Sequence, residues 1–454
     1  MDEKEKIIKI TQNCIGICSF VITLFKYLAE NCQRRDLHKN YFLMISKKNN
    51  IEDLNEIDEL ISILYIIDDF EFDEFLALWI NKINTTKLNA SIFCYVTLLK
   101  IDTSINSLVD SNKFGTSYSD TDDYLFYINT KKTFFEHKLK EFNIRRGRQT
   151  IEYNQNNISN DFNSFDVVKK SQLNNYLPIL KKYNSSCFTK NTIKIGVTSF
   201  DSTSWFNEDK IADSKEFFIT YDDNKKYMMN KKIQKILMNF DDNGADIAIF
   251  PELVMNDTSE KEIKNFIIQN NFNNLKLIFL GSSWNNKQNE AILINTQGTI
   301  LLRHKKKVPY KSYSKTDKCY YEEAIEFDNT INLVDIDGIG RIAYLICADY
   351  NDDALNTICS LMHTDFIFVS AYSNSTDLMM KTARDNASRK AISTILCNSC
   401  AARTQSNREL ISFIVMPKIQ NKRLDNILIP IHNIECNSNV KCQLCCEFID
   451  INNS

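Results

Sequence analysis

Short apolar runs alternate with helical stretches from residue 192 onward, and this pattern restricts the fold more than any other feature of the chain. Residues 193–200 alternate like a strand, and residues 245–250 form an apolar run of strand length. Between such runs, apolar residues recur at helical spacing, as over 225–240 and 377–390. Strands with interleaved helices over about 265 residues predict a single α/β domain.

The other expected elements of this domain follow the same alternation. Residues 291–294 and 299–302 are expected to pair antiparallel around a turn at 295–298, where Gly298 provides the flexible position. The remaining expected strands cover 275–280, 341–346, 365–370 and 392–398, and the remaining helices cover 261–269 and 353–362.

The N-terminal part of the chain has a different character. Apolar residues recur every three or four positions over 7–28, 54–83 and 88–99, which predicts amphipathic helices. Residues 111–123 are expected to form a polar loop, and 124–142 return to helical spacing. We therefore expect an all-α region over 1–150.

A linker is expected between the two parts. Arg145, Arg146 and Arg148 form a small basic cluster, and residues 154–163 are rich in asparagine and almost without apolar side chains. We expect a linker and a connecting helix over 151–190 and the α/β domain over 191–454.

Composition excludes several classes of protein. The net charge of −3 gives no electrostatic attraction for nucleic acid or an anionic membrane. The first residues are acidic, unlike a secretory signal, and the apolar stretch 14–25 is too short to cross a bilayer. Fourteen cysteines without a secretion signal indicate a reducing compartment, so we expect a cytoplasmic protein with free thiols.

Three chemically useful side chains each follow an expected strand. Pro251 and Glu252 end the run 245–250, the lysines 305–307 follow the strand after Gly298, and Cys347 follows 341–346. A thiol attacks a carbonyl carbon well only as a thiolate, so it needs a neighbouring base or cation. The tetrahedral intermediate needs donors for its oxygen, and the leaving amine needs a proton. A carboxylate, an amine and a thiol meet these requirements.

The order of these residues resembles the Glu-Lys-Cys triad of the nitrilase, or carbon–nitrogen hydrolase, superfamily. The Asn-x-Ala-x-Leu-Ile stretch 289–294 and Gly298 ahead of the lysines add to this resemblance. The resemblance implies a four-layer αββα sandwich preceded here by the all-α region. It also implies an amidase- or nitrilase-type enzyme with no metal or organic cofactor.

The resemblance implies a role for each residue of the site. Cys347 would be the nucleophile and Glu252 the general base and acid. Lys306 and the backbone N–H of Ala348 would stabilise the tetrahedral intermediate. Lys305 and Lys307 would point to the other face of the extended chain, since side chains alternate. A second glutamate that orients the lysine is expected at Glu323, with Glu322 as the alternative.

The chain departs from the family pattern after the last expected strand. Asn398 resembles the end of a late core strand, but residues 399–403 lack the glycine often found there. Arg384 and the two residues after it match the preceding helix only in part. These positions bear on the substrate pocket and on assembly, so the identity of the substrate stays open.

Two C-x-x-C pairs raise the question of a metal site. Cys397 pairs with Cys400 and Cys442 with Cys445, a pattern that also occurs in four-thiolate zinc sites. Cys397 lies within an apolar strand, and residues 442–448 are expected as a short C-terminal strand. We therefore interpret these cysteines as core thiols and expect no metal.

The favoured hypothesis is a cysteine hydrolase that cleaves a non-peptide carbon–nitrogen bond of a small amide or nitrile through a Cys347 thioester. One alternative is a non-catalytic assembly platform; a homo-oligomer is expected by resemblance in either case, without a membrane partner. Another is a module of a bacterial antiphage defence system, because nitrilase-type domains are found joined to reverse transcriptases. The helical N-terminal region would then bind the reverse transcriptase or a nucleic acid.

Overall fold

The computed structural model describes residues 2–46, 51–63, 72–110, 118–120, 124–128, 165–183, 188, 192–199, 205–402, 412–420, 423–431 and 446–452. The described chain divides between Asn174 and Asn175 into two compact units. We call the first the helical unit and the second the sandwich unit. The arginine cluster 145–148 and the asparagine-rich stretch 154–163 lie outside the described residues.

Helices make up the helical unit as far as Asp110, as the apolar spacing predicted. They are α1 (Glu3–Thr11), α2 (Ile17–Asn31), α3 (Arg34–Ser46), α4 (Ile51–Ile63), α5 (Phe72–Thr85) and α6 (Ala90–Asp110). Their core is centred on the buried Trp79, whose ring lies 5.0 Å from the ring of Phe20. The expected helix over 7–28 is divided in two, because the chain leaves the helical conformation before Gly16, the residue ahead of α2.

Three short strands follow the helices, and they correct two predictions. β1 (Tyr118–Asp120), β2 (Tyr124–Ile128) and β3 (Phe165–Lys169) form an antiparallel sheet in the order β1-β2-β3. Residues 118–120 are therefore not a loop. Residues 124–128 are not helical either, because they pair with β3. The ring of Phe126 on β2 packs against the ring of Phe165 on β3 in the core. Residues 129–142 lie outside the described part of the chain.

The connecting helix expected over 151–190 is also wrong where the chain is described. β3 is followed by the short 3-10 helix η3 (Lys170–Gln172) and by β4 (Leu177–Tyr183). β4 pairs parallel with β14 (Thr330–Ile336) over its whole length and is an outer strand of the largest sheet. The sheet of the sandwich unit thus begins at Leu177, ahead of the expected boundary at 191.

Two large sheets form the centre of the sandwich unit. The six-stranded sheet has the order β11-β10-β9-β8-β5-β20, and the seven-stranded sheet has the order β19-β18-β17-β16-β15-β14-β4. The strands of the first are β5 (Thr192–Thr198), β8 (Ile247–Ile249), β9 (Leu277–Asn285), β10 (Gln288–Asn295), β11 (Ile300–Lys305) and β20 (Cys446–Asn452). Those of the second, besides β4 and β14, are β15 (Gly340–Ile346), β16 (Phe366–Ala371), β17 (Ser393–Asn398), β18 (Ser412–Gln420) and β19 (Arg423–Ile431).

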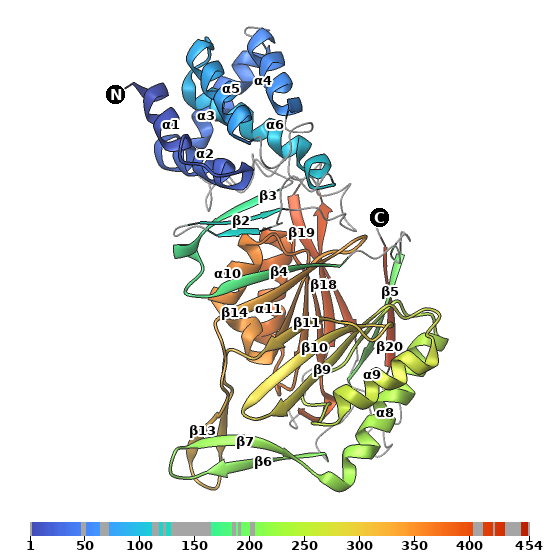
Figure 1. The fold of residues 1–454 in the computed structure, drawn as a ribbon. Helices are drawn as coiled ribbons and strands as arrows, with labels where there is room; N and C mark the ends of the chain where they lie inside the picture. Colours follow the sequence, from blue (N-terminus) through green and yellow to red (C-terminus); the bar gives the residue numbers. More distant parts are fainter. Residues whose placement is uncertain are drawn as a thin grey trace. The chain divides into compact units, whose positions relative to one another are not determined.

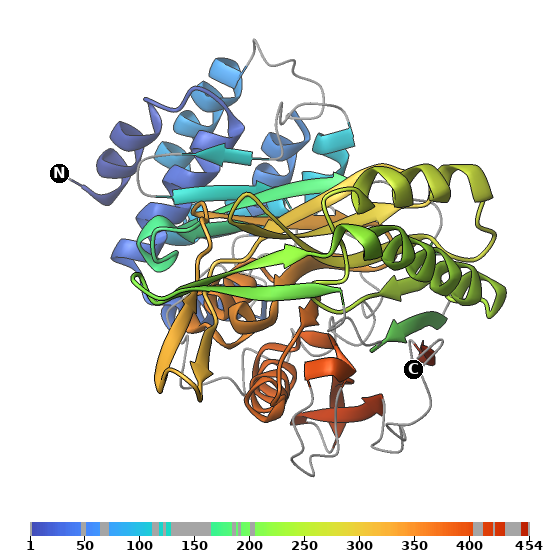
Figure 2. The same cartoon turned by 90° about the horizontal axis from the view of Figure 1, so that it is seen from below.

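Helices cover the outer face of each large sheet (Figures 1 and 2). α8 (Asp223–Asp242) and α9 (Ser259–Asn270) pack on the six-stranded sheet through an apolar cluster that includes Phe240, Ile267 and Ile278. α11 (Asp377–Lys390) packs along β17, β18 and β19. α10 (Asp353–Leu361) lies beside α11, and Asn386 donates a hydrogen bond to Asn356 across the pair at 2.8 Å.

The inner faces of the two sheets pack against each other. The ring of Phe279 on β9 stacks on the ring of Phe368 on β16 with centroids 3.8 Å apart. Phe279 also meets Tyr344 on β15 edge to face at 5.0 Å. Alternate residues of β9 thus face α8 and α9 on one side and the second sheet on the other. The layers are helix, sheet, sheet and helix, which confirms the four-layer sandwich.

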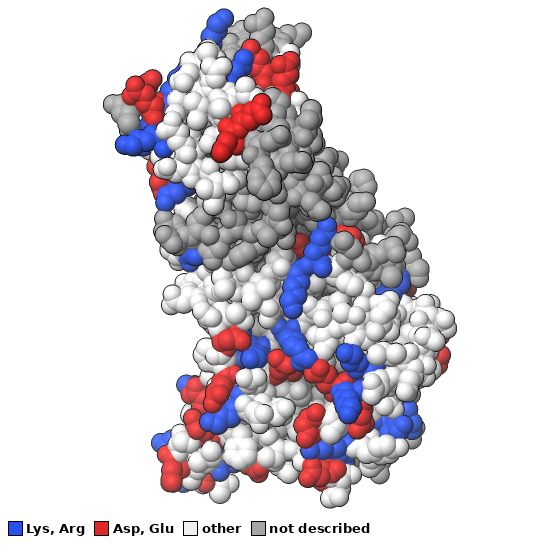
Figure 3. Space-filling view, viewed as in Figure 1, with Lys and Arg blue, Asp and Glu red and all other residues white. Residues whose placement is uncertain are grey.

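A smaller sheet lies at one end of the sandwich unit, and the sequence did not predict it (Figure 1). Its order is β12-β13-β7-β6, from β6 (Phe206–Ile211), β7 (Glu216–Tyr221), β12 (Lys311–Ser314) and β13 (Cys319–Glu323). These strands carry many charged residues, whose acidic and basic side chains are intermixed on the face of Figure 3. Only a few apolar residues, such as Phe217 and Tyr321, are buried beneath it.

The C-terminal strand predicted over 442–448 is found at β20, Cys446–Asn452; residues 442–445 lie outside the described residues. Every described helix is too short or too polar to cross a membrane.

Candidate active site

Cys347 stands where the central strand β15 ends. All seven residues of β15 are buried, and the chain turns directly from Ile346 into the short 3-10 helix η4 (Cys347–Asn351). The turn gives Cys347 a φ of 45°, a left-handed conformation that costs free energy for a residue with a side chain. The thiol is 3% exposed, and Sγ lies 4.0 Å from the carbonyl oxygen of Tyr372. The sheet therefore holds this sulfur in a fixed, buried place.

Glu252 follows β8, separated from it by Phe250 and Pro251. Its Oε2 accepts a hydrogen bond from the backbone N–H of Tyr372 at 2.9 Å. Oε1 accepts one from Nδ2 of Asn289, also at 2.9 Å. Both carboxylate oxygens are thus oriented, one by a residue of β10 and one by the residue that follows β16, and Glu252 is 2% exposed.

The backbone around Glu252 is tightly constrained. Leu253, the next residue, has a φ of 59°, so the chain turns sharply just after the carboxylate. Gly281 on β9 has a φ of 77°, and a Cβ added there would overlap the carbonyl oxygen of Pro251. Glycine is required at this position both for the conformation and for the close approach to the segment that carries Glu252.

Lys306 is the first residue after β11 and connects the two glutamates. Its Nζ lies 2.9 Å from Oε1 of Glu252 and 2.6 Å from Oε2 of Glu323, and the side chain is 2% exposed. Lys305 and Lys307 point elsewhere, and both pair with Asp328, at 3.5 Å and 2.7 Å. Because side chains alternate along the extended chain, Lys306 is the one lysine of residues 305–307 that reaches Glu252 and Glu323.

Glu323 rather than Glu322 faces Lys306. Glu323 is 5% exposed, its Oε2 accepts a hydrogen bond from the N–H of Tyr310 at 2.9 Å, and its Oε1 accepts one from Nδ2 of Asn289 at 3.1 Å. Glu322 lies on the other face of β13, where it pairs with Lys311 at 3.2 Å at the surface.

The charges of these groups influence one another strongly because they are buried. Burial raises the pKa of Glu252, the Lys306 ammonium opposes that rise, and the Glu323 charge adds to it. Burial alone would lower the pKa of Lys306, but Glu252 and Glu323 outweigh it and hold this pKa well above its usual value. Burial raises the pKa of Cys347, with Glu252 adding to the rise and Lys306 opposing it. Before substrate binds, the site therefore holds a thiol, an ammonium and two carboxyl groups.

Ala348 is the second residue of η4. The first N–H groups of a helical turn have no acceptor within that turn, so they are available to a ligand. The backbone N–H of Ala348 thus lies in the same turn as Cys347. This is the position expected of a donor to the oxygen of an intermediate bound at the thiol.

Asp349 joins the segment of Lys306 to the turn of Cys347. Its Oδ1 accepts hydrogen bonds from the N–H groups of Lys307 and Val308, at 2.9 and 2.8 Å. Its Oδ2 lies 2.8 Å from Nε2 of His304. Asp349 stands two residues after Cys347 in the sequence, but local spacing gave no indication of this connection, because its partners lie more than forty positions away.

Two asparagines also support the site without having been predicted to do so. Nδ2 of Asn289 donates to both Glu252 and Glu323; Asn289 was the first residue of the Asn-x-Ala-x-Leu-Ile stretch, which was the available signal. Asn398, at the end of β17, accepts from the N–H of Ser373 and donates to its carbonyl oxygen, at 2.9 and 2.8 Å. It thereby fixes the loop whose Tyr372 N–H binds Glu252.

A cavity of about 220 Å³ opens onto these groups. It is lined by Glu208, Phe217, Ile219, Glu252, Leu253, Lys306, Tyr310, Ser312, Glu323, Cys347, Tyr372, Asn374 and Ala402. It is smaller than the roughly 300–1,000 Å³ sites that hold drug-sized ligands, so it suits a small molecule.

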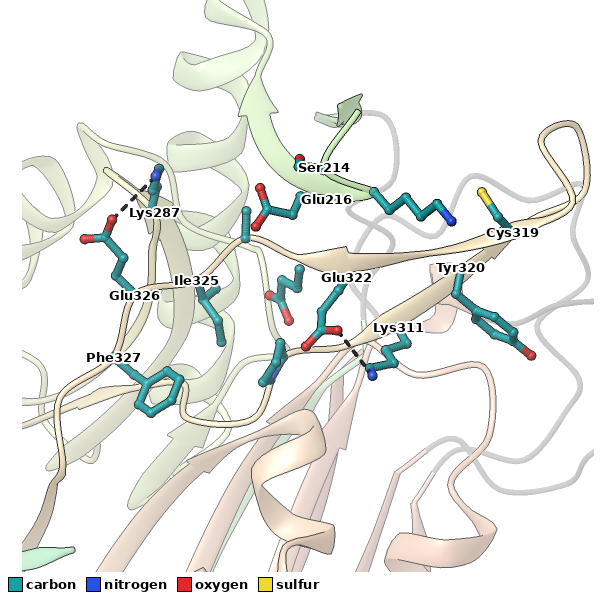
Figure 4. Close-up of a pocket in the computed structure, with 14 residues that line it drawn as sticks. Ser214, Glu216, Lys287, Lys311, Cys319, Tyr320, Glu322, Ile325, Glu326 and Phe327 are labelled. Carbon is teal, nitrogen blue, oxygen red and sulfur yellow. Dashed lines mark ion pairs between the residues drawn. The ribbon is translucent and has the colours of Figure 1, made fainter. Parts of the chain in front are cut away.

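A larger hollow of about 800 Å³ lies on the outer side of β13 (Figure 4). Of the four groups described above it includes only Glu323. Four of its charged side chains form ion pairs with each other, Lys287 with Glu326 and Lys311 with Glu322. The smaller cavity, which contains the thiol, is therefore the candidate active site.

Among the described residues, no group of three or more histidine, cysteine, aspartate or glutamate side chains is arranged to hold a metal ion. Sγ of Cys397 lies 3.0 Å from the carbonyl oxygen of Thr198 within the core. Cys442 and Cys445 lie outside the described residues.

No family model matches the sequence, and no curated protein matches it. Among solved structures, Nit3 of Saccharomyces cerevisiae, a member of branch 10 of the nitrilase superfamily, is 12% identical; the match covers 60% of this chain and 93% of that chain, with a TM-score of 0.40. The NitFhit protein of C. elegans is 13% identical over 58% of this chain and 61% of that chain, with a TM-score of 0.38. A mutant of the Nesterenkonia AN1 amidase from the nitrilase superfamily is 12% identical over 57% of this chain and 90% of that chain, with a TM-score of 0.37. In its motifs and its layer order, the chain resembles the nitrilase superfamily.

Proposed function

We propose that the sandwich unit is a carbon–nitrogen hydrolase that cleaves a small amide or nitrile through a thioester or thioimidate on Cys347. One observation carries this proposal. A buried lysine lies between two buried glutamates, at 2.9 and 2.6 Å, in the same small cavity as a strand-end thiol. Burial of an ammonium and two carboxyl groups is costly, so a purely structural role is a poor explanation for this arrangement.

The first half-reaction of an amide begins at the thiol. Glu252 takes the proton of Cys347 as the sulfur attacks the carbonyl carbon, and the electron pair of the C=O bond moves to oxygen. The Lys306 ammonium and the Ala348 N–H stabilise that oxyanion. As the intermediate collapses, the C–N bond breaks, and protonated Glu252 gives its proton to the leaving nitrogen. Ammonia or an amine departs and a Cys347 thioester remains.

The second half-reaction uses the same groups. Glu252, again a carboxylate, takes a proton from a water molecule as the water oxygen attacks the thioester carbon. The oxyanion returns to the position beside Lys306, and the C–S bond then breaks. Cys347 leaves as the thiolate and regains its proton from Glu252, and the carboxylic acid product departs. Glu323 keeps Lys306 oriented through both steps, because its Oε2 accepts from Nζ at 2.6 Å.

Trapping of the covalent intermediate tests the proposal directly. The full chain is incubated with a panel of small primary amides and with an activated acyl ester, and each cysteine peptide is examined by mass spectrometry. In the wild type, an acyl group is expected on Cys347. If the ester also acylates Glu252→Gln, the acyl-enzyme should accumulate in that variant, because the base for deacylation is missing. Ammonia release from amides should fall more than about 1,000-fold in Cys347→Ala.

Cys359 provides a matched control, because its thiol is equally buried but lies on α10, away from the cavity. Cys359→Ala should keep the acylation and the amide turnover of the wild type. If Cys347 takes up no acyl group and is no more reactive than Cys359 in the folded protein, the site is not a hydrolase. The assembly-platform hypothesis would then replace this one.

A further inference from the structure

Glu208 is a carboxylate at the cavity that the proposed chemistry does not use. It lies on β6 opposite Ile219 of β7, and cross-strand partners share a face of the sheet. Phe206, two residues away on the same face, packs its ring 5.4 Å from the ring of Tyr372. Ile219, Phe217 and Tyr372 all line the cavity. The register of β6 thus turns Glu208 toward the active site rather than away from it.

The neighbours of Glu208 do not neutralise it. Among the described residues, none makes a hydrogen bond or an ion pair with its carboxylate. Lys210, the next residue on that face, places its Nζ 5.2 Å from the ring centroid of Tyr321 and is not part of the cavity wall. Although Glu208 reaches solvent, loss of hydration raises its pKa; Lys210 opposes the rise and Glu323 adds to it. A cation arriving beside this carboxylate would therefore be bound favourably.

The described residues that line the cavity carry a net negative charge. Glu208, Glu252 and Glu323 contribute three carboxyl groups to this part of the wall, against the ammonium of Lys306. The Lys306 ammonium is already paired with Glu252 and Glu323, which leaves Glu208 as the unpaired charge among the described lining residues. An anionic substrate would be repelled by this wall, and a neutral one would gain nothing from Glu208.

The other lining residues suit the body of a small organic cation. Phe217, Tyr310 and Tyr372 provide aromatic surface, and ammonium or guanidinium groups are attracted to aromatic faces as well as to carboxylates. Ile219 and Leu253 provide apolar surface for a short methylene chain. The cavity therefore offers a place for a charged end group in addition to the place for the scissile bond at Cys347.

We propose that Glu208 is a specificity-determining residue that binds an ammonium or guanidinium group of the substrate, so that the substrate class is small amides or nitriles with a cationic end group. This inference rests on the proposed function, because it assigns the substrate of the same site. Glu208 contacts the substrate away from the reacting atoms and takes no part in proton transfer.

Charge-matched thiol reagents test the cation site without any turnover. Methanethiosulfonates with a trimethylammonium, a neutral methyl or a sulfonate group each form a mixed disulfide with a thiol and release methanesulfinate. In the wild type, Cys347 should react faster with the cationic reagent than with the anionic one, by about ten- to a hundredfold after correction for their rates with a free thiol. Glu208→Gln should reduce this ratio to a few-fold, and Glu208→Lys should reverse it.

Amide turnover gives the second readout. The kcat/KM values for 4-aminobutanamide, pentanamide and succinamic acid compare a cationic, a neutral and an anionic end group at similar length. The cationic amide should be preferred by about ten- to a hundredfold over the neutral one, mainly through KM, and Glu208→Gln should remove most of that preference.

Glu216→Gln is the matched control. It removes the same charge from β7 of the same small sheet, at a position that lines the larger hollow and not the cavity. It should keep the wild-type ratios in both assays. Equal reactivity of Cys347 toward the three reagents in the wild type, or a ratio that Glu208→Gln and Glu216→Gln reduce alike, would overturn the role of Glu208. Failure of the proposed function is distinct, since the reagent ratio can persist when no amide is hydrolysed.

Discussion

Nε2 of His304 lies 2.8 Å from Oδ2 of Asp349, and both side chains are buried. A carboxylate oxygen only accepts hydrogen bonds, so Nε2 carries the proton and donates it. The other oxygen of Asp349 accepts from two backbone N–H groups immediately after Lys306. One aspartate thus fixes the end of β11, which carries the lysine, to the turn that carries the thiol.

Replacement of Asp349 should damage stability and activity together. Asp349→Ala leaves two buried N–H groups and the His304 Nε2–H without an acceptor, which should cost about 3–5 kcal/mol of unfolding free energy. Asp349→Asn keeps one oxygen for the two N–H groups, and His304 can accept from its amide by changing tautomer, so its effect should be smaller. Urea unfolding of the two variants checks the order. A loss in Asp349→Asn equal to that in Asp349→Ala would contradict the assigned hydrogen bonds.

Lys306→Met should destabilise the sandwich unit in a pH-dependent way. Without the ammonium, Glu252 and Glu323 are two buried carboxyl groups facing each other, and the loss at neutral pH should be about 3–5 kcal/mol. The deficit should shrink at acidic pH, because burial raises the pKa of Glu252 and its protonation removes the repulsion between the two groups. Unfolding by urea at pH 5 and pH 8 measures the change. Lys305→Met, which removes only a partly exposed pair with Asp328, should cost at most about 1 kcal/mol.

The reactivity of Cys347 should respond to the charges around it in opposite directions. Burial raises the pKa of this thiol, Glu252 raises it further, and Lys306 lowers it. Iodoacetamide labelling of Cys347 should therefore begin at lower pH in Glu252→Gln than in the wild type, and at higher pH in Lys306→Met. If the proposed mechanism holds, amide turnover should nevertheless be lost in Glu252→Gln, because that variant lacks the proposed base.

Cys359 serves as the internal reference for that experiment. Burial raises its pKa to about 12, and neither Glu252 nor Lys306 contributes to that shift. Its labelling profile should be the same in all three proteins when peptides are quantified one by one. A shift of the Cys347 profile to higher pH in Glu252→Gln would show that the carboxylate does not face the thiol.

Substitution of two glycines with similar backbone conformations distinguishes the cost of backbone strain from the cost of steric overlap. Gly281 and Gly244 have φ values of 77° and 76°, but only at Gly281 would a Cβ meet other atoms, first among them the carbonyl oxygen of Pro251. Gly244→Ala should cost about 1–2 kcal/mol from the backbone alone. Gly281→Ala should cost at least about 3 kcal/mol and displace Glu252, which thermal unfolding and amide turnover would report. Similar losses in the two variants would refute the close approach.

The sequence predicted the central strands well and located three chemically useful residues after strands, for a physical reason. β8, β9 and β15–β17 are buried on both faces along nearly all of their length, so each is a largely apolar run, whereas β5 shows the alternation of a strand. Glu252 and Cys347 follow such runs, at β8 and β15, whereas Lys306 follows the less buried β11. β8 and β11 run in the same direction within one sheet, and β15 of the other sheet packs against β11, so the three residues lie at neighbouring strand ends. The structure also distinguishes Glu323 from Glu322, which lie on opposite faces of β13.

Other parts of the fold could not be predicted in this way. β6, with the sequence FNEDKI, has almost no apolar pattern, and its face is determined only by pairing with β7. Glu208 therefore had no signal in the sequence. Over 124–128, tyrosine, leucine and phenylalanine suit either a helix or a strand, and pairing with β3 decides the outcome. Asp349 and Asn289 carry long-range hydrogen bonds that local spacing does not reveal.

The position of β4 decides where the chain can be divided. Leu177–Tyr183 is paired with β14 along its whole length, although the sequence suggested that the hydrolase domain starts at 191. A fragment beginning at 191 would leave the backbone N–H and C=O groups of β14 unpaired along an open sheet edge, a surface on which other chains can add as strands. Such a fragment should aggregate, whereas one beginning at Asn175 carries its own protecting edge.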